Sequence, residues 1–221
     1  MKKGDGASGF SKDYWDVNYA TPDEMDGIGN VSSHVDYIKS LFEIEYIDVS
    51  SIADFGFGLG HLFEGVLDHF KPYKALGIEP SKHIYELVKK RNIKPVDSTK
   101  LKLKNTDLVS WCEENAEKKI RFDLGICTSV FQYLTDEEIE YCLEVLSMKV
   151  KYLYFSVPTD KELKRQVEDL EFEDQYAIKR SRAKYQRMIK KHFTFVSSRM
   201  LESKVYFDEE STFFTDLLFR F

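Results

Sequence analysis

An acidic residue and three glycines form the segment of this sequence best suited to ligand chemistry. The segment, Asp54 to Gly60, reads DFGFGLG, so the glycines stand at alternate positions. Glycine has no Cβ, and a loop of this composition lets the backbone approach a ligand without obstruction. An apolar run precedes the segment and a helical pattern comes after it. This order places the loop at the carboxyl end of a strand, where open α/β sheets bind ligands.

A carboxylate, Glu79, stands about 20 residues after the glycines and ends a second short apolar run. In nucleotide-binding folds, a carboxylate at this place accepts hydrogen bonds from ribose hydroxyls. A dinucleotide fingerprint of the form G-x-G-x-x-G needs a further glycine at position 61 or 63, where this chain has His61 and Phe63. Neither frame fits, so the spacing disfavours a nicotinamide dinucleotide.

The G-x-G-x-G spacing, with Asp54 two residues ahead of it, resembles motif I of the class I S-adenosylmethionine-dependent methyltransferases. The segment 78–81 looks like motif II of that family, and 122–134 is similar to motif IV with the helix entry after it. The resemblance runs from about residue 52 to the C-terminus and is closest through residue 160. It implies a doubly wound, Rossmann-like α/β fold. The seven-stranded sheet would have the order 3-2-1-4-5-7-6, mostly parallel, with strand seven antiparallel at the edge.

The same resemblance implies S-adenosylmethionine as the cofactor. The glycine loop would pass under the methionine part, and Glu79 would hold the ribose. The adenine would meet a third motif, and backbone at the end of strand four would meet the methionine amino group. The cofactor-binding residues implied in this way are Asp54, Gly56, Phe57, Gly58, Gly60, Glu79, Pro80, Asp97, Ser98 and Thr128. The chain departs from the family at Phe57 and Leu59, which replace a small and a hydroxyl residue.

The segment after strand four narrows the class of acceptor. Family members that methylate amino groups of DNA bases or glutamine carry Asn/Asp-Pro-Pro-Tyr/Phe there, whereas this chain has Thr-Ser-Val-Phe at 128–131. No Pro-Cys pair supplies the nucleophile of a cytosine-carbon enzyme. A small-molecule oxygen, nitrogen or sulfur acceptor is therefore favoured. Proximity and desolvation supply much of the rate of methyl transfer, so no base is obligatory, and no catalytic residue is assigned.

Two other functions remain open from the sequence. One is methylation of a protein or RNA side group, with the basic stretch 179–191 as a docking surface. The other is a methyltransferase-like module that binds cofactor or partner without turnover. Because Asp54, the three glycines and Glu79 are all present, a degenerate pocket is disfavoured.

Residues 1–50 are expected to form an N-terminal arm and a first helix, ahead of a cofactor-binding domain over 51–221. Trp15 and Tyr19 in the arm either close over the cofactor as a lid or only attach the arm to the core. The first helix is expected to begin at Ser33, with Asp36 as its acidic capping partner. The residues expected on the acceptor or lid side are Trp15, Tyr19, His34, Gln132 and Tyr133.

Alternating apolar runs and amphipathic stretches predict the elements that position these residues. Ser81 and Thr135 are expected to cap helices, and Thr135 with Glu138 has the spacing of a capping box. Strands are expected over 51–55, 75–79, 93–96, 122–127 and 151–157, with two final strands over 193–206 and 213–221.

Composition agrees with one acidic globular enzyme of 221 residues. The net charge is -6 with 32% charged residues, which disfavours binding to nucleic acid or to an anionic membrane surface. No apolar run reaches the length of a membrane span. The cysteines Cys112, Cys127 and Cys142 match no metal or redox spacing. We therefore expect no metal site, no membrane partner and a cytoplasmic protein with reduced thiols.

Overall fold

The computed structural model describes residues 29–170 and 174–221, so Trp15 and Tyr19 lie outside the described residues. Seven strands form one sheet in the order β3-β2-β1-β4-β5-β7-β6. Five neighbouring strands, from β3 to β5, run parallel, and β7 pairs antiparallel with β5 and β6. The expected seven-stranded, mostly parallel sheet is confirmed. Its strands are β1 Ser51–Phe55, β2 Lys74–Glu79, β3 Lys100–Asn105, β4 Phe122–Thr128, β5 Val150–Ser156, β6 Phe193–Phe195 and β7 Met200–Ser203.

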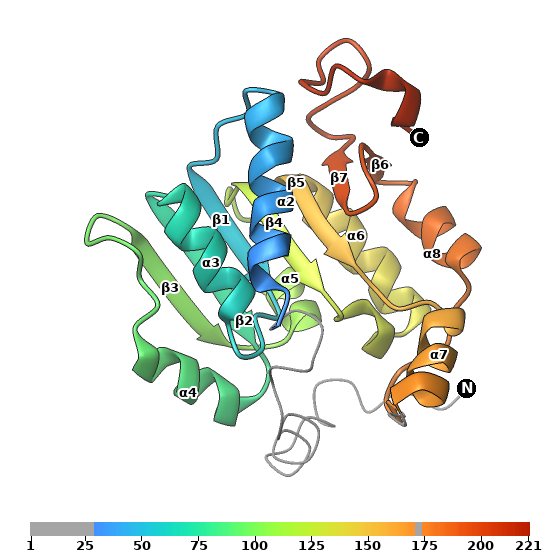
Figure 1. The fold of residues 1–221 in the computed structure, drawn as a ribbon, viewed down its shortest axis with the longest axis horizontal. Helices are drawn as coiled ribbons and strands as arrows, with labels where there is room; N and C mark the ends of the chain where they lie inside the picture. The colour runs from blue at the N-terminus through green and yellow to red at the C-terminus, as the bar shows by residue number, and fades with distance from the viewer. Residues whose placement is uncertain (1–28, 171–173) are drawn as a thin grey trace.

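Helices cover both faces of the sheet (Figure 1). One face packs against α2 (Val31–Ile44), α3 (His61–Phe70) and α4 (Lys82–Arg91). The other face packs against α5 (Leu108–Asn115), α6 (Asp136–Lys149) and α8 (Arg182–Ile189). The remaining helices are α7 (Asp160–Leu170) and the 3₁₀ turns η3 (Phe131–Tyr133) and η4 (Leu217–Phe219). No helix within the described ranges combines the length and apolar character needed to cross a bilayer.

The core is built on central strands that are buried on both faces, as parallel strands between helix layers are. All five residues of β1 are buried. Phe55 meets Trp111 of α5 edge-on, with ring centroids 5.0 Å apart, whereas Tyr152 of β5 lies 5.3 Å from Phe42 of α2 on the other face. The sheet is therefore fixed between two apolar layers, and α2 belongs to the same core as the strands.

Two predicted helix starts are confirmed. The Ser81 hydroxyl accepts the Ile84 N–H at 3.5 Å and begins α4. At α6, the Thr135 N–H donates to Glu138 Oε2 at 2.7 Å, and the Glu138 N–H donates to Thr135 Oγ1 at 3.3 Å, which completes the capping box. The first described helix differs, because α2 begins at Val31 and not at Ser33, with Asn30 as its N-cap residue.

The third strand was predicted in the wrong place. It spans Lys100–Asn105, not 93–96, and pairs in register with β2. Pro95 has no N–H to give to a ladder, which disfavours the earlier segment. Ile93 is buried in the core from a loop, which accounts for its apolar character. The true strand, KLKLKN, is polar at alternate positions because it lies at the edge of the sheet.

The two final strands also differ from expectation. Both β6 and β7 come from the single predicted segment 193–206, which folds back on itself around residues 196–199. The predicted strand over 213–221 is absent from this described part of the chain, which contains η4 instead. Its last residue, Phe221, exchanges two backbone hydrogen bonds with Phe195, at 2.9 and 3.1 Å.

Two tyrosines on the same strand make a matched test of buried hydroxyls. The Tyr152 hydroxyl is buried and has no hydrogen-bond partner in the structure's described residues, whereas the Tyr154 hydroxyl lies 2.5 Å from His34 Nδ1. Tyr154→Phe should lower the free energy of unfolding by about 1 kcal/mol, and Tyr152→Phe should leave it unchanged or raise it. Urea denaturation measures both values, and equal losses in the two variants would contradict this difference.

Candidate cofactor and acceptor site

The glycine loop joins β1 to α3 and has a backbone that few other residues adopt. The φ angles of Gly56, Gly58 and Gly60 are 123°, 52° and 78°. A Cβ at Gly56 would lie 2.6 Å from Val130 Cγ2, so the loop also packs closely on the segment after β4. The Phe57 side chain turns into the core and stacks on Phe63, which leaves the loop's backbone as its ligand-facing part. The family difference at Phe57 is therefore a packing difference.

Glu79 connects the glycine loop to the end of β2. Its side chain is 3% exposed. Oε2 accepts the Gly58 N–H at 3.0 Å, and Oε1 accepts the Ser81 N–H at 2.9 Å. Burial raises the pKa of Glu79 to about 7, although both N–H groups act to lower it. The carboxyl therefore holds the loop against β2 at the carboxyl edge of the sheet.

Asp54 supplies a second buried carboxyl to this edge. Its side chain is 3% exposed, and burial raises its pKa well above the usual range, with a further increase from the charge of Glu79. Two carboxyls that share an apolar setting disfavour each other's ionisation. A positively charged ligand between the two would favour the ionised forms. The site is therefore electrostatically suited to a cation.

The outer side of this edge is formed by the end of β3. The Asn105 side-chain amide donates to the carbonyl oxygens of Glu79 and Pro80, each at 2.8 Å. The Thr106 N–H donates to the same Glu79 oxygen at 3.2 Å, and Asp107 caps α5. Sequence reasoning missed these residues because it placed the strand too early. Their polar cluster directly before a helix was the available signal.

Asp97 and Ser98 lie away from the site, contrary to the expectation from the sequence. They occupy the turn before β3, whose first residue, Lys100, pairs with Lys74 at the start of β2. The last residue of β3, Asn105, pairs with Glu79. The two ends of β3 are five positions apart, which corresponds to roughly 17 Å along the strand. The expected adenine contact of Asp97 and Ser98 is therefore at the wrong edge of the sheet.

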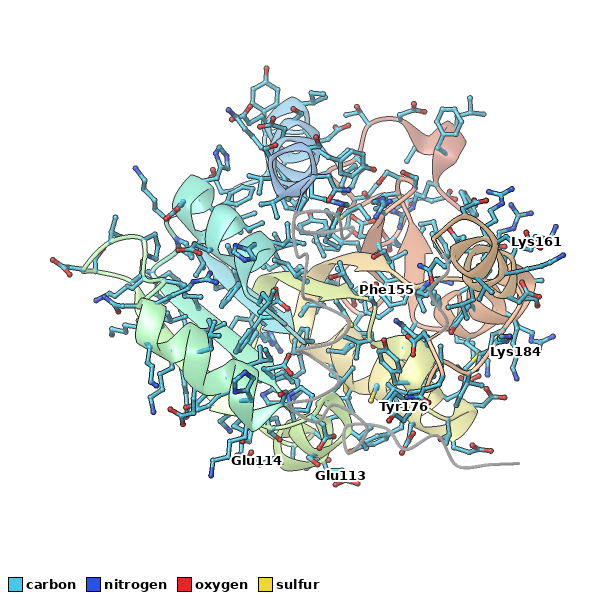
Figure 2. The ribbon with its side chains drawn as sticks, turned by 60° about the horizontal axis from the view of Figure 1, so that its bottom comes forward. Glu113, Glu114, Phe155, Lys161, Tyr176 and Lys184 are labelled. Atoms are coloured by element: carbon cyan, nitrogen blue, oxygen red, sulfur yellow. The ribbon has the colours of Figure 1, made fainter. Side chains whose placement is uncertain are left out.

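The segment after β4 contains two residues that were expected on the acceptor side, Gln132 and Tyr133. Thr128 ends that strand half-buried, and η3 comes after it. Gln132 is 3% exposed, and its Oε1 has no hydrogen-bond partner among the described residues. The Gln132 carbonyl accepts the Ile178 N–H at 2.8 Å, and the Tyr133 hydroxyl donates to Asp174 Oδ2 at 2.7 Å. Residues 174–178 thus pack on η3, and Figure 2 labels Tyr176 of that segment and Phe155 of β5 on this side of the molecule.

Arg180, which belongs to the basic stretch 179–191, is a buried residue that fixes the same region. Its guanidinium is buried and donates to Asp136 Oδ1 at 2.7 Å and to the Leu134 carbonyl at 2.5 Å. Lys184, labelled in Figure 2, also pairs with Asp136, and Lys191 pairs with Glu140 at 2.6 Å. Lys184 and Arg180 together lower the pKa of Asp136. Part of the basic stretch is thus already paired with α6.

His34, which the sequence analysis expected on the acceptor or lid side, lies in the first turn of α2. Its Nδ1 lies 2.5 Å from the hydroxyl of Tyr154, which is fully buried in β5. Sequence reasoning missed Tyr154 because a tyrosine within an apolar strand is usually a core residue. The contact joins residues 120 positions apart, so no local pattern could reveal it.

Comparisons with known proteins match this chain to solved structures of the same fold. No protein-family model and no curated protein sequence matches the chain. Among solved structures, the plantazolicin methyltransferase BpumL, in complex with a pentazolic desmethylPZN analog and SAH, aligns with a TM-score of 0.65 and 14% identity over 85% of this chain and 72% of its own. An S-adenosylmethionine-dependent methyltransferase from Clostridium acetobutylicum gives 0.54 and 16% over 70% and 59%.

The magnesium protoporphyrin IX methyltransferase ChlM from Synechocystis, with bound SAH, aligns with a TM-score of 0.53 and 15% identity over 79% of this chain and 81% of its own. These neighbours are all S-adenosylmethionine-dependent methyltransferases. This chain has their class I fold, including the strand order and the antiparallel β7.

The strained loop gives the first prediction for the site. Gly56→Ala should weaken the loop in two ways, through the φ of 123° and through the contact with Val130. We expect a loss of about 1–3 kcal/mol in the free energy of unfolding. Adding Val130→Ala should relieve the contact but not the backbone strain. Full recovery in the double variant would show that backbone conformation at Gly56 is not restrictive.

The raised pKa of Glu79 predicts how stability depends on pH. The folded state holds a proton on Glu79 up to about pH 7, whereas the ordinary pKa of a glutamate is 4.5. The stabilisation is complete below the lower pKa and is lost as pH rises through the higher one. Glu79→Gln should therefore remove a fall of the order of 2–3 kcal/mol in unfolding free energy between about pH 5 and 8.

A surface substitution supplies the control for this titration. Lys104 and Lys118 lower the pKa of the exposed Glu114 to about 2, so it stays ionised throughout that pH range. Glu114→Gln should keep the slope of the parent protein in urea denaturation series. A Glu79→Gln protein with the parent's slope would mean that Glu79 is ionised in the folded state at pH 5.

Proposed function

We propose that this protein is an S-adenosylmethionine-dependent methyltransferase that acts on an oxygen, nitrogen or sulfur atom of a small molecule. The observation that carries the proposal is the Glu79 carboxyl at the end of β2, bonded to the Gly58 N–H and adjacent to a second buried carboxyl on β1. The class I fold supports the same conclusion.

The site's own residues fit this cofactor. S-adenosylmethionine carries ribose hydroxyls that a carboxylate binds, together with a sulfonium and an ammonium group. A positive charge beside Asp54 and Glu79 lowers the pKa of both carboxyls and offsets the cost of their burial. The glycine loop, at Gly56, Gly58 and Gly60, offers backbone to the methionine part. Thr128 lies on the β4 side of that part.

For the adenine end we propose the residues after β3. Asn105, Thr106 and Asp107 adjoin the Glu79 and Pro80 backbone at the same edge. They take the role that the sequence had assigned to Asp97 and Ser98. The Asn105 amide donates to two carbonyls and the Thr106 N–H to one, so these groups position the edge. The proposed contacts with the adenine are the Thr106 carbonyl and the Asp107 N–H.

A small acceptor is favoured over a protein or RNA by the charge of the surface. The net charge is -6, and two lysines of the basic stretch already pair with Asp136 and Glu140. BpumL is named as a plantazolicin methyltransferase and ChlM as a magnesium protoporphyrin IX methyltransferase. We also infer a cytoplasmic location, since Cys112, Cys127 and Cys142 are buried and unpaired.

Cofactor binding tests the proposal directly. S-adenosylmethionine or S-adenosylhomocysteine at 100 times Kd should stabilise the fold by about 2.7 kcal/mol and raise the Tm, whereas NAD and NADP should not. Glu79→Gln should weaken S-adenosylhomocysteine binding by about 1–3 kcal/mol in calorimetry, and Glu114→Gln should leave it unchanged. A Tm that rises with NAD alone would refute the cofactor assignment. Screening metabolite pools for S-adenosylhomocysteine release then identifies the acceptor.

A further inference from the structure

A histidine and a tyrosine from distant parts of the chain form a hydrogen-bonded pair beside the proposed cofactor site. His34 Nδ1 and the Tyr154 oxygen are 2.5 Å apart, and the two rings meet edge-on at 80° with centroids 5.9 Å apart. Tyr37 packs against Tyr154 at 6.1 Å and donates its own hydroxyl to Ser197 at 2.6 Å. The pair is therefore fixed on both sides.

The register of the sheet locates this pair relative to Asp54. Asp54 pairs with Ile126 of β4, and Ile126 pairs with Tyr154 of β5, so the three residues stand at one level. Directly opposed residues share a face of the sheet, and Tyr154 and Ile126 belong to the apolar layer beneath α2. Two strand spacings separate the Cα atoms of Asp54 and Tyr154, which is roughly 10 Å.

His34 lies in the first turn of α2, and that end of the helix is at the carboxyl edge of the sheet (Figure 1). His34 is half-buried, unlike the enclosed Tyr154. The imidazole therefore stands near the carboxyl ends of β4 and β5, two strand spacings from Asp54. The proposed function puts the acceptor at this edge of the sheet, so the imidazole is suitably placed to remove its proton.

We infer that His34 is the general base for methyl transfer and that Tyr154 is its positioning residue, an inference that rests on the proposed function. When the His34 Nδ1–H donates to the Tyr154 oxygen, the imidazole keeps its lone pair on Nε2. The acceptor's O–H, N–H or S–H bond breaks and its proton moves to Nε2. The freed electron pair forms the bond to the methyl carbon, and the C–S bond electrons stay on sulfur as the neutral thioether. The proton later leaves His34 for solvent.

The tautomer of His34 can be measured without knowing the acceptor. In the full-length protein with S-adenosylhomocysteine, long-range ¹H–¹⁵N spectra at a pH where His34 is neutral should show a protonated Nδ1 and an unprotonated Nε2. Tyr154→Phe should abolish this preference, and Tyr152→Phe, on the same strand and face, should preserve it. A protonated Nε2 in the parent protein would overturn the inference, because that nitrogen could not accept a proton.

Kinetics with the acceptor from the screen give the second measurement. His34→Gln should lower kcat by about 10²–10⁴-fold, the range for general bases, with KM and S-adenosylhomocysteine affinity within about threefold of the parent. Tyr154→Phe should lower kcat less, by roughly tenfold, with the same unchanged affinity. His69→Gln, on the outer side of α3, should match the parent. A His34→Gln protein that retains kcat within about threefold would overturn the base assignment.

Cofactor affinity separates this inference from the proposed function. If the parent protein fails to bind S-adenosylmethionine and S-adenosylhomocysteine, the proposed function is wrong. If it binds both while His34 has the opposite tautomer or is dispensable for kcat, only the role of the His34–Tyr154 pair is wrong.

Discussion

The burial of two carboxyls at one edge of the sheet is the constraint on which the site depends. Glu79 cannot stay buried without donors, and it obtains them from Gly58 and Ser81. Those bonds fix the glycine loop and the start of α4 together, because Ser81 is also the residue that caps that helix. The loop then needs positive φ at three glycines to reach Glu79 and still enter α3. The buried side chain of Glu79 thus fixes the relative positions of a strand, a loop and the start of a helix.

Sequence patterns predicted the elements whose character is local. Continuous apolar runs marked β1, β4 and β5, and the capping box at Thr135 was predictable because its partners lie three residues apart. The edge strand β3 was not predicted, because its lysines alternate with leucines and it has no continuous apolar run. The buried Ile93 in the preceding loop suggested a strand there instead. The pairing of β6 with β7 was missed because one apolar segment contains both strands and the turn between them.

The proposed acceptor side could be predicted only in part, because its residues come from segments that are distant in sequence. His34 and Gln132 were identifiable as polar residues next to expected site elements. Their partners were not, since Tyr154 lies 120 positions from His34, and the Ile178 N–H reaches the Gln132 carbonyl from beyond α7. Arg180 holds these segments together. Its guanidinium donates to the carbonyl of Leu134 and to the carboxylate of Asp136. Its own carbonyl accepts the Asp160 N–H at 2.7 Å. A buried arginine of this kind looks like an ordinary surface cation in sequence.

The lysines of β3 have an effect outside the site. An outermost strand offers unpaired N–H and C=O groups to which another chain can add, and edge lysines oppose such addition. Lys100 and Lys102 are exposed along β3, and Lys104 is held by Glu114 at 2.9 Å. At the other end of the sheet, the backbone of Phe221 occupies part of the β6 edge. One border of the sheet therefore resists aggregation through charge and desolvation, and the other because Phe221 of the same chain already pairs with part of it.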